Sequence, residues 1–363
     1  MKITTIAVLL LAVSVTAHAQ MSDQAFKNVR LLKGIPVDQF MATMGFFSAS
    51  LGETCTDCHS AESGGSWARY ADDNPRKETA RRMIGMMNAI NKTYFGGRRE
   101  ITCYSCHRGV ERPDVTPGLA ELYGPPQVKE PDELREPAAR RGASADQILD
   151  RYIQAAGGAD RLSKLASFAA QGTYQGYQDE KYPVDVFVRA APDEISTVIH
   201  TSSGDSTTTF DGHAGWIAGP ATERPVPLIE LTGGDLTGAR LDGSLWFPAQ
   251  IKQALMSWRA AGAAKIDGRE MQMVQGSSDG RYPVNLYFDS KSGLLARLVR
   301  YSDSPVGLSP TQIDYADYRD VAGVEMPFRI MVTWLDGKST TQFTEIRANA
   351  PIDAARFEKP AGH

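Results

Sequence analysis

The sequence has little of the material that most enzyme and membrane-protein classes require. No stretch beyond the N-terminal segment approaches the roughly 20 consecutive apolar residues of a membrane-spanning helix. The net charge of the 363 residues is only −4, with basic and acidic residues interspersed, so no nucleic-acid partner is expected. There is no Gly-rich phosphate-binding loop and no nucleophile-base pattern. Cysteine is also scarce, with four in the chain, and histidine stands at six.

An N-terminal export signal is the first positive feature. Lys2 precedes an apolar run over residues 6–15, and Ala17-His18-Ala19 has the small-x-small form that signal peptidase reads. We therefore expect residues 1–19 to be a cleaved signal peptide. The mature protein is expected in the periplasm, within reach of the outer face of the inner membrane. No cysteine stands near the cleavage site, so no lipid anchor is expected.

All four cysteines lie in two copies of the pattern C-x-x-C-H. In c-type cytochromes two such thiols add across the haem vinyl groups, and the adjacent imidazole ligates the iron. The sequence therefore predicts two covalently attached haem c groups. The predicted residues are Cys55, Cys58 and His59 for the first haem and Cys103, Cys106 and His107 for the second.

Two other uses of the cysteines are alternatives to haem attachment. An oxidising compartment favours disulfides, but a disulfide framework gives no reason for a histidine directly after each pair. A tetrahedral zinc site would take four thiolates from two pairs that lie far apart in the sequence, and neither histidine would be a ligand.

Methionine is the best-placed candidate for the sixth position of each iron. The remaining histidines of the mature chain all lie in its C-terminal part: His200, His213 and His363. Methionines instead precede each motif at helical spacing: Met41 and Met44, then Met83, Met86 and Met87. Such a methionine is more often core packing, but an iron without a second ligand favours ligation, so Met44 and Met83 are predicted as axial ligands.

Five arginines flank the same segments, and two roles remain open for them. A guanidinium group matches a haem propionate bidentately, whereas a solvated basic face is an equally good interpretation. These residues are Arg81, Arg82, Arg98, Arg99 and Arg108.

The order of helical and strand-like segments along the chain predicts an α+β protein of two domains. Residues 20–112 are interpreted as an α-helical dihaem cytochrome c domain, with helices over residues 38–51 and 75–94. Residues 113–144, rich in proline and charged residues, are expected to form a linker. Residues 145–363 are interpreted as an antiparallel, half-open β-barrel with a few helices.

Two kinds of segment support the barrel. Helices are expected over residues 145–156 and near residues 248–260. Short alternating runs bounded by turn residues predict strands. These runs are Val184–Val188, Thr207–Phe210, Val284–Phe288, Leu294–Tyr301, Phe328–Trp334 and Thr340–Ile346.

The N-terminal residues resemble the cytochrome c subunit of photosynthetic reaction centres. The resemblance lies in "NVRLLKGIPVDQFMATMGFFSASLGETCTDCH" and in "ARRMIGMMNAINKTYFGG" followed by "ITCYSCHRG". It implies two haem-binding modules, each with the methionine of the preceding helix as sixth ligand, which again selects Met44 and Met83. Partners implied are redox proteins, including a membrane-bound electron-transfer complex or a reaction centre.

The chain departs from that family in ways that limit what is carried over. Four-haem members have two further motifs, which this chain lacks. They also have a histidine after the second Met-bearing helix, whereas Asn91 to Gly97 contains none. The resemblance therefore extends to haem binding and electron transfer, and not to a photosynthetic host.

The C-terminal part is similar in texture to lipoprotein-carrier domains of the LolA/LolB type. The similarity lies in "ILDRYIQAAGGADRLSKLASFAAQGTY", "LYFDSKSGLLARLVRY" and "IDYADYRDVAGVEMPFRI". It implies an apolar groove for a lipid or quinone-like molecule; a docking domain with a filled core is the alternative. The tryptophans considered for such a groove are Trp216, Trp246, Trp258 and Trp334.

The function predicted from these features is electron transfer without enzymatic activity. Two alternatives are a dihaem peroxidase or ligand-sensing haem protein, in which one iron keeps an open position, and a carrier of an apolar ligand through the C-terminal domain.

Overall fold

The computed structural model describes residues 19–59, 66–117, 142–176, 179–191, 193–222, 225–277 and 283–360. Nearly all of the predicted signal peptide and most of the predicted linker therefore lie outside the described residues. Within the described ranges, no helix is both long and apolar enough to cross a membrane.

The N-terminal part is built from helices that begin and end where the sequence places their caps. Helix α2 begins after Pro36 and ends at Gly52, which adopts the left-handed conformation at φ 67°. Helix α4 is capped by Asn74, whose side chain accepts a hydrogen bond from the Lys77 amide at 3.0 Å, and Pro75 takes the first helical position. The helices of this part are α1 Ser22–Ala25, α2 Val37–Leu51, α3 Cys55–Cys58, the 3₁₀ turn η2 Trp67–Ala71, α4 Pro75–Phe95 and α5 Cys103–His107.

The C-terminal part is one antiparallel sheet of thirteen strands, in the order β6-β5-β4-β3-β2-β1-β13-β12-β11-β10-β9-β8-β7. Its strands are β1 Ser167–Gln175, β2 Lys181–Arg189, β3 Glu194–Thr201, β4 Gly204–Phe210, β5 Gly215–Ala218, β6 Leu228–Glu230, β7 Ser257–Ile266, β8 Arg269–Ser277, β9 Pro283–Asp289, β10 Leu295–Ser304, β11 Gly307–Val321, β12 Val324–Trp334 and β13 Gly337–Ala348. Neighbouring strands are joined by hairpins or short connections except at β1 and β13, which pair across the whole domain. The predicted strand segments all fall within these strands to within one residue.

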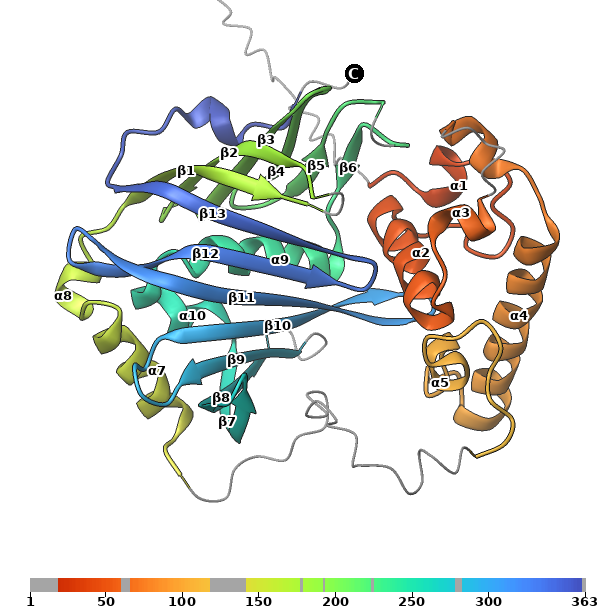
Figure 1. Ribbon diagram of the computed structural model, residues 1–363, viewed down its shortest axis with the longest axis horizontal. Helices are drawn as coiled ribbons and strands as arrows, with labels where there is room; N and C mark the ends of the chain where they lie inside the picture. Colours follow the sequence, from red (N-terminus) through yellow and green to blue (C-terminus); the bar gives the residue numbers. More distant parts are fainter. Residues whose placement is uncertain are drawn as a thin grey trace, which may run out of the picture.

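Helix α9 lies against one face of the sheet and explains its curvature. It contacts β3 and β4 on one side and β10 on the other, so the sheet curls around it and stays open between β6 and β7 (Figure 1). The remaining helices are α7 Ala145–Ala155, α8 Ala159–Leu162, α9 Gly233–Ser244, η3 Pro248–Gln250, α10 Ile251–Ala254 and η4 Ala354–Phe357. Together these elements form the large antiparallel open sheet with helices that the sequence predicts.

The helix that the sequence predicts near residues 248–260 is only partly confirmed. Residues 257–260 begin strand β7, and the 12-residue helix α9 precedes the expected range. The expected helix is confirmed over residues 248–254, as η3 and α10. The sequence does not predict α9, because its four glycines lower helix propensity.

The main core lies between the sheet and helices α7 and α9. Leu149 and Ile251 are fully buried beside Phe168, and the rings of Phe168 and Trp246 lie 5.7 Å apart. Trp246 belongs to this core and Trp258 packs against it, whereas Trp216 is buried elsewhere in the sheet domain. Trp334 lines a cavity between the sheet and α2.

Helix α2 joins the helical part to the sheet. It contacts β6, β10 and β11, and the two parts lie side by side with α2 between them (Figure 1). At one end, Phe46 packs with Met87 and with Val306 in the β10–β11 turn. Arg99 reaches across to Asp303 and to the carbonyl of Ser304. The helical part therefore rests on the strand ends of β10 and β11.

Candidate functional site

A cavity of about 530 Å³ in the helical part brings most of the predicted haem-site residues together. Cys58 and His59 line it from the first motif, and Cys103 and His107 line it from the second. The other cysteine of each motif, Cys55 in the first and Cys106 in the second, is exposed. The cavity is therefore shared by both motifs.

Of the five methionines before the motifs, Met44 and Met83 line this cavity. Met87 is buried against Phe46, Met41 faces the sheet, and Met86 is 48% exposed. The two methionines chosen from the sequence therefore share the cavity with both histidines, whereas the other three do not.

Each motif forms a short helix with a reciprocal cap. Thr54 caps α3, and its amide donates to the Asp57 carboxylate at 2.7 Å. Thr102 caps α5 in the same way with Ser105 as its partner. In one helical turn, cysteines three residues apart lie on the same face, which suits attachment of both thiols to one planar group.

Both motif histidines are oriented by backbone carbonyls. His59 Nδ1 lies 3.0 Å from the Tyr70 carbonyl oxygen, and His107 Nδ1 lies 3.1 Å from the Val110 carbonyl oxygen. A carbonyl oxygen only accepts, so Nδ1 carries the proton and Nε2 is left with a free lone pair. This is the arrangement by which a second hydrogen bond fixes a metal-binding imidazole.

The electrostatics keep the first imidazole neutral. Burial and the nearby Lys77 ammonium lower the pKa of His59, although its hydrogen bond to Tyr70 acts in the other direction. The Tyr70 ring also stacks on His59 with centroids 4.6 Å apart. No pattern in the sequence marked Tyr70, because its contact with His59 depends on how the segment after the motif folds back.

The structure disfavours the two alternative uses of the cysteines. All four thiols are unpaired. Burial raises the pKa of the Cys58 and Cys103 thiols. Across the described ranges, no three His, Cys, Asp or Glu side chains converge to hold a metal ion.

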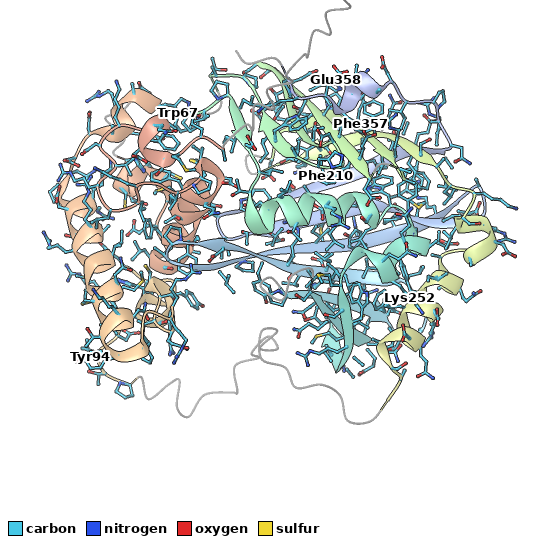
Figure 2. The ribbon with its side chains drawn as sticks, turned by 180° about the vertical axis from the view of Figure 1, so that it is seen from behind. Trp67, Tyr94, Phe210, Lys252, Phe357 and Glu358 are labelled. Carbon is cyan, nitrogen blue, oxygen red and sulfur yellow. The ribbon has the colours of Figure 1, made fainter. Side chains whose placement is uncertain are left out.

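The helical part leaves apolar side chains uncovered where a large planar group would cover them. Three residues of the 21 in α4 are buried, namely Ile84, Met87 and Asn91. Met83 is 37% exposed, and Tyr104 of the second motif is 55% exposed. Tyr94 projects from the far end of α4 (Figure 2). The donor set and this uncovered apolar surface both fit a haem c group.

Asn91 is the residue that positions the second motif from α4. Its side-chain amide donates to the Ile101 carbonyl at 2.7 Å, and its side-chain oxygen accepts from the Glu100 and Ile101 amides. The sequence alone indicates only that residues 91–97 contain no histidine.

The arginines and the remaining histidines take varied positions. Arg81 lines the cavity and pairs with Asp73 at 2.8 Å, and Arg98 pairs with Glu100. His200 lies on the sheet between Asp185 and Asp205, and His213 is exposed. Neither histidine lines the haem cavity, and His363 lies outside the described residues.

Residues 6–120 match the model of the photosynthetic reaction centre cytochrome C subunit family. This range contains both motifs, Met44 and Met83. The helical part is therefore similar to a cytochrome c subunit.

Two curated relatives give the extent of this similarity. The reaction centre cytochrome c subunit of Thermochromatium tepidum is 35% identical over 92 residues, covering 24% of this chain and 22% of that protein. The subunit of Rubrivivax gelatinosus is 30% identical over 117 residues, covering 28% and 29%. The chain therefore spans less than a third of the curated relatives it matches.

The C-terminal part is similar to different solved structures. A LolA superfamily protein from Nitrosomonas europaea aligns with 60% of this chain and 99% of its own, at 16% identity and a TM-score of 0.41. The lipoprotein LppX of Mycobacterium tuberculosis aligns with 57% of this chain and 97% of its own, at 15% identity and a TM-score of 0.24.

Proposed function

We propose that this chain is an exported dihaem c-type cytochrome that passes electrons between partner proteins. Cys55, Cys58 and His59 would hold one haem. Cys103, Cys106 and His107 would hold the other. The observation that carries this proposal is the single cavity shared by both motifs.

Met44 and Met83 are the proposed sixth ligands. They line the cavity with the two histidines, and the neighbouring methionines do not. A thioether and an imidazole on the same haem iron would raise the reduction potential and favour electron transfer. The chain's own residues orient the ligands, through the Tyr70 and Val110 carbonyls, and the apolar faces of α2 and α4 exclude water.

The proposed location and partners follow from the export signal and the family similarity. Cleavage after Ala19 would deliver the protein to the periplasm. Its partners there would be redox proteins, including a membrane-bound complex of the reaction-centre kind. The N-terminal residue of the purified mature protein, read by mass spectrometry, tests the cleavage site.

A haem count and a ligand-sensitive spectrum test the central proposal. The pyridine haemochrome assay should give two c-type haems per chain. Near-infrared magnetic circular dichroism of the oxidised protein should show the thioether-to-iron band and little high-spin iron. A high-spin fraction that binds cyanide or peroxide would instead support the peroxidase or sensor alternative.

Methionine variants test the ligand assignment, with controls on the same helices. Met44→Leu and Met83→Leu should each produce one high-spin haem with a lowered potential, and leave the other haem unchanged. Met41→Leu and Met87→Leu are the controls, because Leu replaces a packing Met at a cost below about 1.5 kcal/mol. A spectrum unchanged by Met83→Leu would remove Met83 from the site.

A further inference from the structure

A second cavity, of about 650 Å³, lies between α2 and the sheet. Its volume falls within the range of roughly 300–1,000 Å³ typical of small-molecule sites. Met41 and Gly45 line it from α2, Phe210 and Ile217 from β4 and β5, and Trp334 from β12. Most of its wall is apolar, and nothing in the haem-site proposal uses it.

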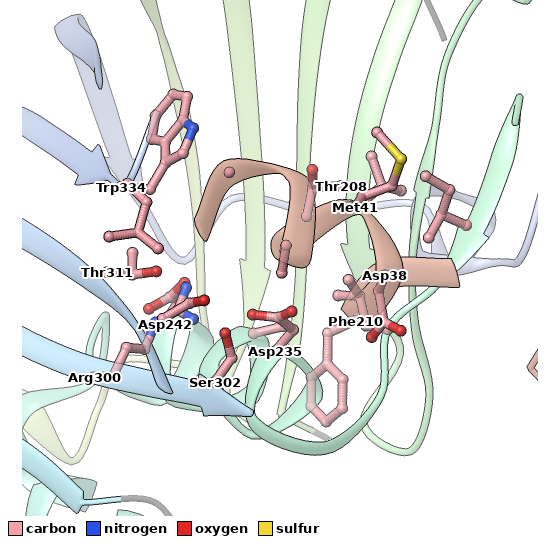
Figure 3. A pocket seen from close by; sticks show the side chains of 18 of the residues that line it. Asp38, Met41, Thr208, Phe210, Asp235, Asp242, Arg300, Ser302, Thr311 and Trp334 are labelled. Atoms are coloured by element: carbon pink, nitrogen blue, oxygen red, sulfur yellow. The ribbon is translucent and has the colours of Figure 1, made fainter. Parts of the chain in front are cut away.

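One side of this cavity is polar and built into the fold. Asp235 and Asp242 of α9 lie beside Arg300 and Ser302 of β10 (Figure 3). The Arg300 guanidinium donates to Asp242 at 3.0 Å. A Cβ at position 238 would collide with that guanidinium, so Gly238 makes the room in which Arg300 sits.

Polar atoms on this wall lack partners within the part of the chain that the structure describes. They are Asp242 Oδ1, Arg300 Nε and Ser309 Oγ, all three buried. Ser309 as a whole residue is only 7% exposed and lines the cavity. An unpaired buried polar atom costs about 1–3 kcal/mol, so a ligand with both a donor and an acceptor would recover hydrogen bonds here.

The charges on the lining select against an anionic ligand. Arg300 is opposed by Asp235 and Asp242, and Asp38 and Asp336 also line the cavity. Carboxylates therefore outnumber guanidinium groups. A fatty-acid or phosphate head would meet four carboxyl groups and one guanidinium, whereas a hydroxyl group would find acceptors.

Aromatic rings connect the second cavity to the first motif. Trp67 lines the cavity, and its ring lies 5.0 Å from that of Tyr70 in an edge contact. Tyr70 in turn stacks on His59 at 4.6 Å. A molecule in the cavity is therefore linked to the axial histidine through two rings in contact.

Helix α2 is the shared wall between the two cavities. Met41 and Gly45 face the second cavity, and Met44 and Phe40 face the haem cavity. The opposite faces of a helix are separated by about 10 Å. The two cavities are therefore about one helix apart.

We infer that this second cavity binds a neutral hydroquinone with an apolar ring system, which reduces the haem held by His59 and Met44. The inference rests on the proposed haem function. Oxidation of the hydroquinone to the quinone breaks two O–H bonds and releases two electrons and two protons. The two electrons would need two one-electron acceptors, which the two haems of the proposed function would supply, and Asp235 or Asp242 would accept the protons and pass them on to water.

Burial supports the proton step independently of the cavity's shape. It raises the pKa of the Asp235 and Asp242 carboxyls, although Arg300 opposes the shift. A carboxyl with a raised pKa accepts a proton more readily near neutral pH.

The test uses the full-length holoprotein with 1,4-naphthoquinone as the binding probe and 1,4-naphthohydroquinone as the reductant. Equilibrium dialysis against the ferric protein should detect naphthoquinone binding. Thr311→Phe fills the cavity from β11 and should weaken binding about tenfold or more, a change of about 1.4 kcal/mol. Thr333→Phe on β12, exposed and outside the cavity, is the matched control and should leave binding within about twofold.

A second variant tests the electron path. At a naphthohydroquinone concentration that saturates the cavity of each protein, Trp67→Leu should slow haem reduction about tenfold or more. Reduction by dithionite, which needs no bound quinone, should not change.

The outcomes separate this inference from the haem proposal. Two low-spin haems without naphthoquinone binding, or equal binding by both threonine variants, would overturn the inference alone. Tighter binding of stearate than of naphthoquinone would overturn the hydroquinone assignment in favour of lipid carriage. A haem count of zero would overturn the proposed function whatever the binding result.

Discussion

Gly52 joins the two motif-bearing segments at a single point. It ends α2 with φ 67°, and a Cβ there would collide with the carbonyl oxygen of Gly109, just after the second motif. The Gly109 amide donates to the Ser50 carbonyl at 2.9 Å. The close approach of these two backbones therefore requires glycine at position 52.

We predict that Gly52→Ala destabilises the protein far more than Gly34→Ala. Gly34 has the same backbone conformation, φ 68°, but no atom lies within 4 Å of its Cβ position. Gly34→Ala should cost about 1–2 kcal/mol for the left-handed conformation alone. Gly52→Ala adds the backbone collision, so its urea midpoint should be clearly lower. Equal midpoints would show that the Gly109 segment moves aside without cost.

At this scale the sequence predicts the chemistry of the haem site better than its surroundings. The C-x-x-C-H spacing is local, so the attachment residues can be read directly from it. Met44 and Met83 were favoured over their neighbours by position on predicted helices. Trp67 and Tyr70 could not be found this way, because their ring contacts with each other and with His59 arise from tertiary folding.

At the scale of elements, α2 connects the helical part to α9. Thr232, the residue before α9, donates its amide hydrogen to Asp38 at 2.6 Å and its hydroxyl hydrogen to the same carboxylate at 2.8 Å. Asp38 is only 7% exposed. Burial raises its pKa above the ordinary value of 3.8, outweighing these hydrogen bonds, and the charge of Asp235 acts in the same direction.

This raised pKa predicts an unusual pH dependence of stability. Because the pKa is higher in the folded state, the protonated form favours folding. The contribution is complete below the unfolded pKa and is lost as pH rises through the folded pKa. Asp38→Asn does not titrate and places an amide against Thr232, at a cost of about 1–3 kcal/mol.

The stability gap between wild type and Asp38→Asn should therefore narrow as the pH rises from 4 to 8, measured by urea unfolding at both ends of the range. Asp23→Asn is the control. Its hydrogen bond from the Gly34 amide lowers the pKa of Asp23, so that carboxylate stays mostly ionised throughout this range. A gap for Asp38→Asn that widens with pH would contradict the prediction.

The sequence predicted α2, α4 and α7 because their caps and apolar periodicity agree. It missed α9, whose glycines serve contacts rather than helix formation. Gly234 lies against the backbone of Ser302, and Gly238 makes room for Arg300. A helix whose composition is set by close packing against a sheet cannot be recognised from propensity alone.

At the scale of the whole molecule, the strand pattern predicted the class of fold but not its assembly. Hairpins between successive strands follow from local turns. The pairing of β1 with β13 and the packing of α2 against β10 and β11 join residues far apart in the sequence. No local pattern encodes such contacts.

An apolar contact holds the helical part against the sheet more strongly than the ion pair between them does. Phe46 is 7% exposed, and a Cβ at Gly307 would lie 2.6 Å from its ring, so ring and strand are packed without space. The charged contact between Arg99 and Asp303 is partly exposed, at 37% and 24% of the two side chains. Such a pair contributes about 0.2–1 kcal/mol.

We therefore predict that Phe46→Ala uncouples the two parts, whereas Arg99→Gln does not. Loss of the buried ring should cost about 3–5 kcal/mol. In the wild type, haem absorbance and far-ultraviolet circular dichroism should report one coincident urea transition. In Phe46→Ala the haem transition should move to lower urea and separate from that of the sheet.

Phe40→Ala is the control on the opposite face of α2, where the side chain lines the haem cavity and stacks on Phe26 at 4.8 Å. It removes a ring of the same size from the same helix without touching the sheet. It should lower the haem transition through loss of cavity packing, but naphthoquinone binding at the sheet side should survive. Phe46→Ala should weaken that binding, because α2 is the wall it displaces. If both variants affected binding equally, α2 would not be held against the sheet by Phe46, and the two parts would associate through the polar contacts at Asp38 and Arg99 instead.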